Sequence, residues 1–253
     1  MYTIILAGGL GKRMNSDIPK VLHKVNGIPM ICHVIQEAFK LDTKEIMIVV
    51  GRYKETINKT LQSFCSKQEY RKITYIHQED KTIDGEIKTM GTGHAINCCV
   101  PHLKELRVDG DENVVILSGD VPLIKHSTID LLLKDKNTLL TTILGDPYGC
   151  GRIFTNNYNE IAKITEEKDC NEEQKRCKKV NCGIYNLNID TIIQCVPLIT
   201  NNNKSNEYYL TDIVEIAQTH KIPIYPVLLP LQNTNEVLNV NTPNDLEIAN
   251  ARV

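Results

Sequence analysis

Leu6-Ala-Gly-Gly-Leu-Gly-Lys-Arg-Met14 is the stretch around which the rest of the sequence is organised. The apolar, β-branched run at residues 2–6 predicts a buried strand that leads into this stretch. A glycine-rich loop therefore follows the first strand, at the edge where open α/β sheets bind their ligands. Gly8, Gly9 and Gly11 lack a Cβ atom, so backbone N–H groups in the loop can approach a phosphate closely.

Two cations, Arg13 and Lys20, follow the glycines and suit the same anionic ligand. The loop is not a P-loop, because no Gly-Lys-Ser/Thr follows at the required spacing. It also departs from the dinucleotide-binding fingerprint, whose third glycine would fall at Arg13. A plain connection between a strand and a loop stays open as the alternative on these residues alone.

Strand and helix patterns alternate through the first half of the chain. Apolar runs predict strands at residues 45–50, 73–77 and 113–117, and helical spacing predicts helices at residues 53–64 and from Ser127 onward. Continuous apolar strands separated by helices are typical of a parallel sheet that is covered on both faces. We therefore predict an α/β fold with a doubly wound, mostly parallel sheet and helices on both faces.

The second half is less regular. Strands are predicted at residues 138–144, 161–165, 180–187 and 222–229, and helices at residues 209–220 and 242–252. The last helix begins with Thr242 as its N-cap and Pro243 at its first position. No linker, low-complexity tract or repeat divides the sequence, so residues 1–253 are predicted to form a single domain.

Charge and composition exclude several classes of partner. A net charge of −2 predicts neither a nucleic-acid surface nor a membrane surface. No apolar run approaches the roughly 20 residues that span a bilayer, and the first strand starts at once, which leaves no room for a signal peptide. The nine cysteines are irregular in spacing and form no C-x-x-C pair, which favours free thiols over zinc or disulfides. We therefore expect a cytoplasmic protein.

Asp120 follows the predicted strand at residues 113–117, so its carboxylate also lies at the ligand-binding edge of the sheet. Near phosphates, a carboxylate suits Mg²⁺, which prefers one or two protein oxygens together with phosphate oxygens. Asn241, after the apolar Leu238 and Val240, can supply a second, neutral oxygen. Each residue also has an ordinary interpretation, Asp120 in a turn and Asn241 at the start of a helix.

Met90-Gly-Thr-Gly-His-Ala95 places two glycines directly before a helical stretch. The N–H groups at the start of that helix, with the Thr92 hydroxyl, can hydrogen-bond a nucleobase edge or a phosphate. An ordinary helix start explains the same pattern equally well. His94 fits a packed or capping residue better than a catalyst.

Polar groups suited to a sugar recur in the second half. A second glycine-rich turn at residues 147–153 leads into a strand, and carboxylates, amides and hydroxyls gather at residues 164–169, 180–185 and 206–212. Such groups can hold sugar hydroxyls and an acetamido group. Taken singly, each segment also fits a loop, a strand end or a helix cap.

Taken in order, these motifs resemble those of the sugar-nucleotide pyrophosphorylases, which join a nucleoside triphosphate to a sugar 1-phosphate. The more specific resemblance is to the amino-terminal uridylyltransferase domain of the bifunctional N-acetylglucosamine-1-phosphate uridylyltransferase/acetyltransferases, and it covers nearly the whole chain. The matching segments are Leu6-Ala-Gly-Gly9, Ser16-Asp-x-Pro-Lys-Val-Leu-His23, Gly91-Thr-Gly-His-Ala95, Gly119-Asp-Val-Pro-Leu-Ile124, Gly149-x-Gly-Arg-Ile153, Lys168-Asp169, Asn181-x-Gly-Ile184 and Glu207-Tyr-Tyr-x-Thr-Asp212. The last block and the spacing around Asn181 favour an N-acetylhexosamine over plain glucose.

The resemblance implies a reaction and a role for each site residue. The reaction is the Mg²⁺-dependent formation of UDP-N-acetylglucosamine and pyrophosphate from UTP and N-acetylglucosamine 1-phosphate. Arg13 and Lys20 would meet the phosphates, and Asp120 and Asn241 would bind Mg²⁺. The nucleotide would be held by Leu6, Ala7, Gly8, Gly9, Gln78, Gly91, Thr92 and Gly119, and the sugar by Gly151, Glu166, Asn181 and Tyr209.

The chain departs from the family pattern at several points. Lys12 replaces a small hydroxyl residue beside the triphosphate, and Ser118 replaces a tyrosine before Gly-Asp. Residues 79–90 form a longer segment than usual, which bears on the assignment of Gln78. The chain also stops at Val253 without the family's second, β-helical domain, so no acetyl transfer is expected.

Two alternatives stay open. One is the same enzyme class with another sugar or base, and the other is a catalytically inactive sugar-nucleotide-binding or regulatory subunit. The joint presence of Arg13, Lys20, Asp120 and Asn241 argues against an inactive subunit, because binding alone would tolerate their loss. The expected partners are small-molecule substrates, and an oligomer is possible.

Overall fold

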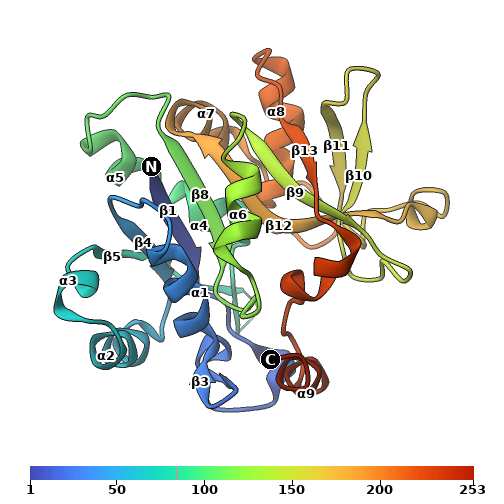
Figure 1. Ribbon diagram of the computed structural model, residues 1–253. Helices are drawn as coiled ribbons and strands as arrows, with labels where there is room; N and C mark the ends of the chain where they lie inside the picture. Colours follow the sequence, from blue (N-terminus) through green and yellow to red (C-terminus); the bar gives the residue numbers. More distant parts are fainter. Residues whose placement is uncertain (84) are drawn as a thin grey trace.

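A computed structural model describes residues 1–83 and 85–253, and within them nine strands form one mixed sheet (Figure 1). One part of this sheet consists of β8 (Asn113–Ser118), β1 (Tyr2–Leu6), β4 (Ile46–Val50) and β5 (Ile73–His77), which lie side by side in that order, with β5 at the edge. Each neighbouring pair among these four runs parallel. Leu6 lies opposite Ser118 in the register, so β1 and β8 end at the same level.

Helices cover both faces of these parallel strands. One apolar cluster includes α1 (Met30–Phe39), α2 (Lys54–Phe64) and α6 (His126–Leu132), and the other includes α4 (Thr92–Asn97), α5 (Val100–Glu105), α7 (Ile189–Cys195) and α8 (Ile213–Thr219). Within β1, Ile5 belongs to the first cluster and Ile4 to the second, because successive side chains of a strand point to opposite faces. The predicted α/β sheet with helices on both faces is confirmed.

The second half of the chain extends the sheet through antiparallel pairs. The strand β12 (Lys179–Asn188) runs antiparallel to β8, to β9 (Thr138–Ile143) and to β10 (Arg152–Thr155). β11 (Ile161–Thr165) pairs antiparallel with β10, whereas β13 (Tyr225–Leu228) pairs parallel with β9. The sheet is therefore parallel where the glycine-rich loop lies and mixed where the predicted sugar-binding segments lie.

The sequence patterns do not predict the shortest helices and strands, because three or four residues carry too little periodicity. Examples are α3 (Lys67–Tyr70) and the hairpin of β6 (Lys81–Ile83) and β7 (Glu86–Lys88). This hairpin belongs to the longer segment at residues 79–90, of which residue 84 lies outside the described part of the chain. The predicted helix at residues 209–220 is a short 3₁₀ turn, Leu210–Asp212, followed by α8.

The last helix, α9 (Pro243–Asn250), begins as the sequence predicts. The Thr242 hydroxyl accepts a hydrogen bond from the Asp245 N–H at 3.2 Å, and the Asp245 carboxylate accepts one from the Thr242 N–H at 2.8 Å. In Figure 1, α9 lies beside the hairpin formed by β2 (Lys24–Val25) and β3 (Ile28–Pro29). The segment that precedes α9 is thereby brought back to the region of the glycine-rich loop.

Candidate active site

The glycine-rich loop and the segment that contains Asp120 lie side by side, because β1 and β8 are parallel neighbours. The Gly119 N–H donates to the Leu6 carbonyl oxygen at 2.9 Å, and the Ala7 N–H donates to the Val49 carbonyl oxygen at 2.8 Å. A Cβ atom at position 119 would lie 3.1 Å from the Leu6 oxygen. Glycine therefore permits the close approach that aligns the two strand ends.

Arg13, Lys20, Asp120 and Asn241 come together at this edge. The Lys20 ammonium forms an ion pair with the Asp120 carboxylate and donates to Asn241 Oδ1 at 3.1 Å. Arg13 Nη2 donates to the same Asn241 oxygen at 2.9 Å. The Lys20 and Asp120 side chains are only 15% and 8% exposed, so water screens this ion pair weakly. Residues that are far apart in the sequence thus form one compact charged cluster.

Two further side chains hold the Asp120 carboxylate. Ser118 Oγ donates to Asp120 Oδ1 at 2.6 Å. Asn239, with its amide nitrogen turned toward the carboxylate, donates to Asp120 Oδ1 at 3.2 Å and to Oδ2 at 3.0 Å. From the sequence, Ser118 is only a departure from the family pattern, and Asn239 is not predicted as a site residue. The position of Asn239 two residues before Asn241, in the same extended segment, is the signal that could have identified it.

A cavity of about 320 Å³, the central cavity, opens beside this cluster. The predicted site residues that line it are Leu6, Ala7, Gly8, Gly9, Lys20, Gln78, Gly91, Thr92, Asp120, Glu166 and Tyr209. Val21, Thr89, Ala95, Ser118 and Glu207 complete its wall. Its volume falls within the range of small-molecule sites, roughly 300–1,000 Å³. The central cavity therefore joins residues from both halves of the chain.

A second cavity of about 760 Å³, the cationic cavity, shares Thr89 and Glu207 with the central cavity. Its lining includes Arg13 and the lysines Lys12, Lys81, Lys88 and Lys168. Such a concentration of positive charge attracts a polyanion. Lys81, Lys88 and Lys168 are not predicted as site residues, although Lys168 lies in a segment that matches the family pattern. Two of them belong to the β6–β7 hairpin and the third to a charged turn, and neither segment carries a phosphate-binding pattern.

Gln78 follows β5 and is only 6% exposed. Its Nε2 donates to the Gly91 carbonyl oxygen at 3.1 Å and lies 3.2 Å from His94 Nδ1. A Cβ atom at Gly8 would lie 2.8 Å from Gln78 Oε1, so the glycine makes room for this amide oxygen beside the loop. The structure therefore brings Gln78 together with two of the glycines that the resemblance assigns to the nucleotide.

The start of α4 is fastened to the segment that contains Tyr209. The Gly93 N–H donates to the Tyr208 carbonyl oxygen at 2.8 Å, and the Tyr208 N–H donates to the Met90 carbonyl oxygen at 2.9 Å. Gly91 has a φ of +95°, and a Cβ atom there would lie 2.5 Å from the Tyr208 oxygen, so this position requires glycine. Thr92 Oγ1 accepts a hydrogen bond from the Leu210 N–H at 3.1 Å.

Of the predicted sugar-binding residues, Glu166 and Tyr209 reach the central cavity. Glu166 Oε1 accepts a hydrogen bond from Thr211 Oγ1 at 2.9 Å. Burial raises the pKa of the Glu166 carboxyl, and the neighbouring Asp212 and Asp169 carboxylates add to the effect. The hydrogen bond from Thr211 therefore restrains the orientation of Glu166 in the cavity wall.

Gly151 and Asn181 do not line the central cavity in the described structure. Gly151 lies next to the wall, since a Cβ atom there would be 3.4 Å from Glu166 Oε1. The Asn181 N–H donates to the Gly151 carbonyl oxygen at 2.9 Å. The Asn181 amide is already engaged within β12, because its Nδ2 donates to the Tyr185 hydroxyl at 2.9 Å and its Oδ1 accepts from the Gly183 N–H at 2.7 Å.

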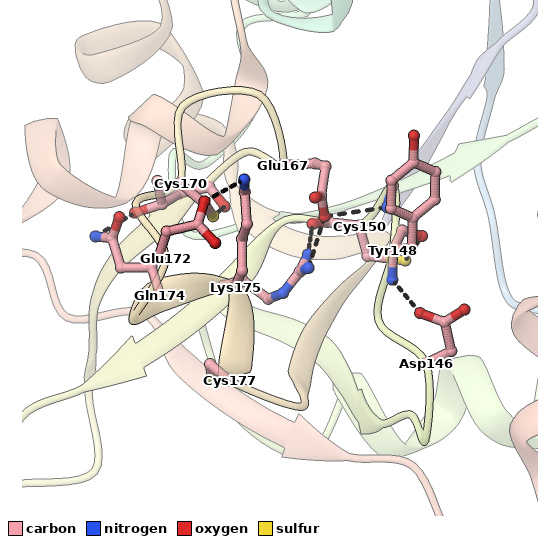
Figure 2. A network of polar contacts seen from close by, with 12 residues as sticks. Asp146, Tyr148, Cys150, Glu167, Cys170, Glu172, Gln174, Lys175 and Cys177 are labelled. Carbon is pink, nitrogen blue, oxygen red and sulfur yellow. Dashed lines mark hydrogen bonds and ion pairs between the residues drawn. The ribbon is translucent and has the colours of Figure 1, made fainter.

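A buried ion pair joins the glycine-rich turn of the second half to the segment that contains Glu166 (Figure 2). Arg152 Nη2 lies 2.6 Å from Glu167 Oε2, and the arginine side chain is 2% exposed. The same carboxylate oxygen accepts from the Gly149 N–H at 3.1 Å, and Arg152 Nη1 donates to the Cys150 carbonyl oxygen. The sequence analysis named the neighbours Gly151 and Glu166 but missed this pair.

Within the described residues, the structure shows no disulfide, no metal-binding cluster of His, Cys, Asp or Glu side chains, and no membrane-spanning helix. All nine cysteines are free thiols. Among residues 1–83 and 85–253, no group of three His, Cys, Asp or Glu side chains is arranged to hold a metal ion. In the same residues, no helix has the length and apolar character needed to cross a membrane.

A glycine-rich loop, clustered cations and a carboxylate at the edge of a parallel sheet are typical of enzymes that act on nucleotides. Residues 3–143 match the family model of the MobA-like NTP transferase domain. A relative named "Probable UDP-N-acetylglucosamine pyrophosphorylase", from Acanthamoeba polyphaga mimivirus, is 39% identical over 98% of this chain and 94% of its own length. The chain therefore belongs to the MobA-like NTP transferase family, and it is a nucleotidyltransferase.

Two further comparisons agree with this assignment. The "Bifunctional protein GlmU" of Clostridium botulinum (strain ATCC 19397 / Type A) is 36% identical over 94% of this chain, which spans 49% of that protein. The chain thus spans about half the length of such bifunctional relatives. The solved structure titled "The Crystal Structure of UDP-glucose pyrophosphorylase complexed with UDP-glucose" matches the whole chain and 98% of its own, with a TM-score of 0.73 at 19% identity. This last likeness shows the fold. The predicted resemblance to sugar-nucleotide pyrophosphorylases is confirmed.

Proposed function

We propose that this nucleotidyltransferase converts UTP and N-acetylglucosamine 1-phosphate to UDP-N-acetylglucosamine and pyrophosphate. The observation that carries the proposal is the charged cluster, in which Lys20 contacts both Asp120 and Asn241 beside the central cavity. The names of the two relatives support the choice of substrates. The nine free thiols suit a cytoplasmic enzyme.

The transfer requires no general base. An oxygen of the sugar phosphate forms a bond to the α-phosphorus of UTP, and the bond between that phosphorus and the bridging oxygen of pyrophosphate breaks. The electron pair of the broken bond leaves with pyrophosphate. Because a phosphomonoester has a second pKa of about 6, the attacking oxygen is largely ionised at neutral pH. The protein therefore accelerates the reaction by positioning the substrates and by neutralising charge.

Arg13 and Lys20 are the cations assigned to the phosphates. Arg13 lines the cationic cavity, where its planar guanidinium can contact paired oxygens of the departing pyrophosphate. Lys20 lines the central cavity and acts as a point charge for the phosphates of substrate and product. The neighbouring Lys12, Lys81, Lys88 and Lys168 raise the local concentration of the polyanion.

Nucleotidyltransferases generally use a divalent metal ion, and the residues present fit one. The Asp120 carboxylate and the Asn241 amide oxygen converge on a single cationic group, the Lys20 ammonium. We assign these two oxygens to Mg²⁺, which prefers one or two protein ligands beside phosphate oxygens. When bound, the ion would offset negative charge on the phosphates.

The remaining residues are assigned by their place around the central cavity. Leu6, Ala7, Gly8, Gly9, Gln78, Gly91 and Thr92 line this cavity and are assigned to the nucleotide, through backbone groups of the loop and the start of α4. Gly119 is assigned to the nucleotide as well, although it does not line the cavity and its N–H donates to the Leu6 carbonyl oxygen. Glu166 and Tyr209 face the sugar, whereas Gly151 and Asn181 support that wall. The acidic Glu166 suits the hydroxyl and amide donors of an N-acetylated sugar.

A pyrophosphate-release assay across four nucleoside triphosphates and several sugar 1-phosphates tests the proposal. We expect Mg²⁺-dependent release that needs both UTP and N-acetylglucosamine 1-phosphate. Turnover with glucose 1-phosphate at or above that with the N-acetylated sugar would refute the sugar assignment. Tight UDP-sugar binding without turnover of any pair would instead support a regulatory subunit. Asp120→Asn serves as the matched inactive control.

A further inference from the structure

The amide of Gln78 is held in one orientation by two acceptors. Nε2 donates to the Gly91 carbonyl oxygen at 3.1 Å and meets His94 Nδ1 at 3.2 Å. Because an amide nitrogen can only donate, His94 Nδ1 accepts and the ring proton lies on Nε2. Both amide hydrogens of Gln78 are therefore used inside the protein, whereas no hydrogen bond to Oε1 is found among the residues that the structure describes.

The opposite orientation of the Gln78 amide is unfavourable. It would place Oε1 against the Gly91 carbonyl oxygen and the Nδ1 lone pair of His94, so that acceptors would face acceptors. The present orientation instead directs Oε1 toward the glycine-rich loop, where a Cβ atom of Gly8 would lie only 2.8 Å away. Gln78 and Gly8 both line the central cavity. The cavity thus presents a fixed hydrogen-bond acceptor at this point.

We propose that His94 sets the base specificity of the enzyme by fixing Gln78 Oε1 toward the nucleobase. This inference rests on the proposed function, in which UTP occupies the central cavity. Uracil carries an N3–H donor that pairs with a carbonyl oxygen. Cytosine carries an acceptor at N3, so the same oxygen repels it. His94 does not line the central cavity, and it therefore acts as a positioning residue through Gln78.

The surroundings of His94 keep its ring suited to this task. The residue belongs to the first turn of α4, and its ring centroid lies 6.0 Å from that of Tyr208. Burial lowers the pKa of His94, the nearby Lys81 adds to the decrease, and Glu79 opposes it. The ring is then neutral at pH 7, which leaves Nδ1 free to accept. A protonated Nδ1 would remove the acceptor that holds Gln78 Nε2.

The test compares UTP with CTP in two variants. His94→Leu removes the acceptor, whereas His94→Asn supplies an amide oxygen near the position of Nδ1. We expect His94→Leu to reduce the ratio of kcat/KM for UTP over CTP by about tenfold or more, since leaving buried polar groups mismatched has that scale of cost. We expect His94→Asn to retain most of the wild-type ratio. Equal ratios in wild type and His94→Leu would overturn the inference and leave the proposed function intact.

The wild-type protein provides two further checks. If it used CTP as well as UTP, this inference would fail and the proposed conversion of UTP would stand, whereas absence of turnover with UTP would refute the proposed function itself. Assigned ¹⁵N chemical shifts of His94 report its tautomer without any substitution. We expect a protonated Nε2 and an unprotonated Nδ1 at pH 7. A proton on Nδ1 would overturn the inference even if His94→Leu failed to fold.

Discussion

The side of the central cavity that we assign to the nucleotide (the nucleotide side) and the side that we assign to the sugar (the sugar side) are held together in different ways. On the nucleotide side, backbone groups meet directly, as between Gly119 and Leu6 or between Gly93 and Tyr208. On the sugar side, side chains add connections to the backbone bond between Asn181 and Gly151, as in the Arg152–Glu167 ion pair and the hydrogen bond from Thr211 to Glu166. The first side therefore depends on the absence of Cβ atoms, and the second on matched polar partners.

This difference indicates how each side can change. A larger residue at Gly91 would collide with the Tyr208 backbone, so the nucleotide side admits few substitutions. Polar pairs can be exchanged together, provided that no buried group loses its partner. We therefore expect sugar preference to be altered by paired substitutions more readily than base preference is altered by substitutions in the glycine loops.

The charged cluster joins the two sides, and Asp120→Ala should have the largest effect. It removes the carboxylate assigned to the metal ion, so we expect activity to fall by at least about 1,000-fold. The protein should stay folded because Asp120 lies outside the apolar clusters, but the melting temperature should fall, since the largely buried Lys20 ammonium loses its partner. Steady-state kinetics at saturating Mg²⁺ and a thermal melt measure both quantities. Asn241→Ala should act in the same direction but more mildly. Near-normal turnover of Asp120→Ala would disprove the ligand assignment.

On the nucleotide side, Arg13→Ala should reduce turnover alone, whereas Lys20→Ala should reduce both turnover and binding. Loss of Arg13 should lower kcat by about 100- to 1,000-fold with little change in KM, because its contact strengthens as charge grows on pyrophosphate. Loss of Lys20 should lower turnover and also weaken UDP-sugar binding. Lys59→Ala, which removes an exposed lysine of α2, is the control and should leave both unchanged. Turnover of Arg13→Ala within a few-fold of wild type would rule out its transition-state contact.

Arg152→Met should damage the sugar side selectively. It leaves the Glu167 carboxylate without its buried partner, which should cost about 3–5 kcal/mol of stability. Displacement of the Gly151 turn should raise KM for the sugar phosphate by about tenfold or more, with KM for UTP nearly unchanged. Lys175→Met breaks the neighbouring exposed pair with Glu172 and should change neither quantity (Figure 2). An equal rise in both KM values would remove the distinction between the two sides.

The smallest effect concerns Asp212, whose pKa is raised to about 6 by burial and by the neighbouring Glu215 and Asp169. The folded protein then binds more protons than the unfolded chain between the ordinary pKa of 3.8 and about 6. Stability therefore falls as pH rises through this window, and the loss is complete above it. Asp212→Asn should raise the melting temperature at pH 7 but not at pH 3.5. Asp130→Asn, on the exposed side of α6, is the control. A similar increase at both pH values would contradict this account.

The parts of the site that were predictable from sequence are those with a local pattern. The glycines before Arg13 follow an apolar strand, and the Gly91-Thr-Gly segment precedes a helix. Their place at the edge of the sheet therefore follows from chain order. The contact between Arg152 and Glu167 depends on how β10 meets a distant turn, which no local pattern encodes. The same holds for Ser118, whose hydrogen bond to Asp120 gives the departure from the family pattern a structural role.

The backbone hydrogen bonds between Tyr208 and residues Met90 and Gly93 have a thermodynamic consequence. They fasten the first turn of α4, on the nucleotide side, to the segment that carries Tyr209 on the sugar side. A displacement of one segment would strain the bonds to the other, so a substrate that orders its own side is expected to act on the other side as well. We therefore expect the binding of the two proposed substrates to be coupled, and by linkage each would change the affinity of the other by the same factor.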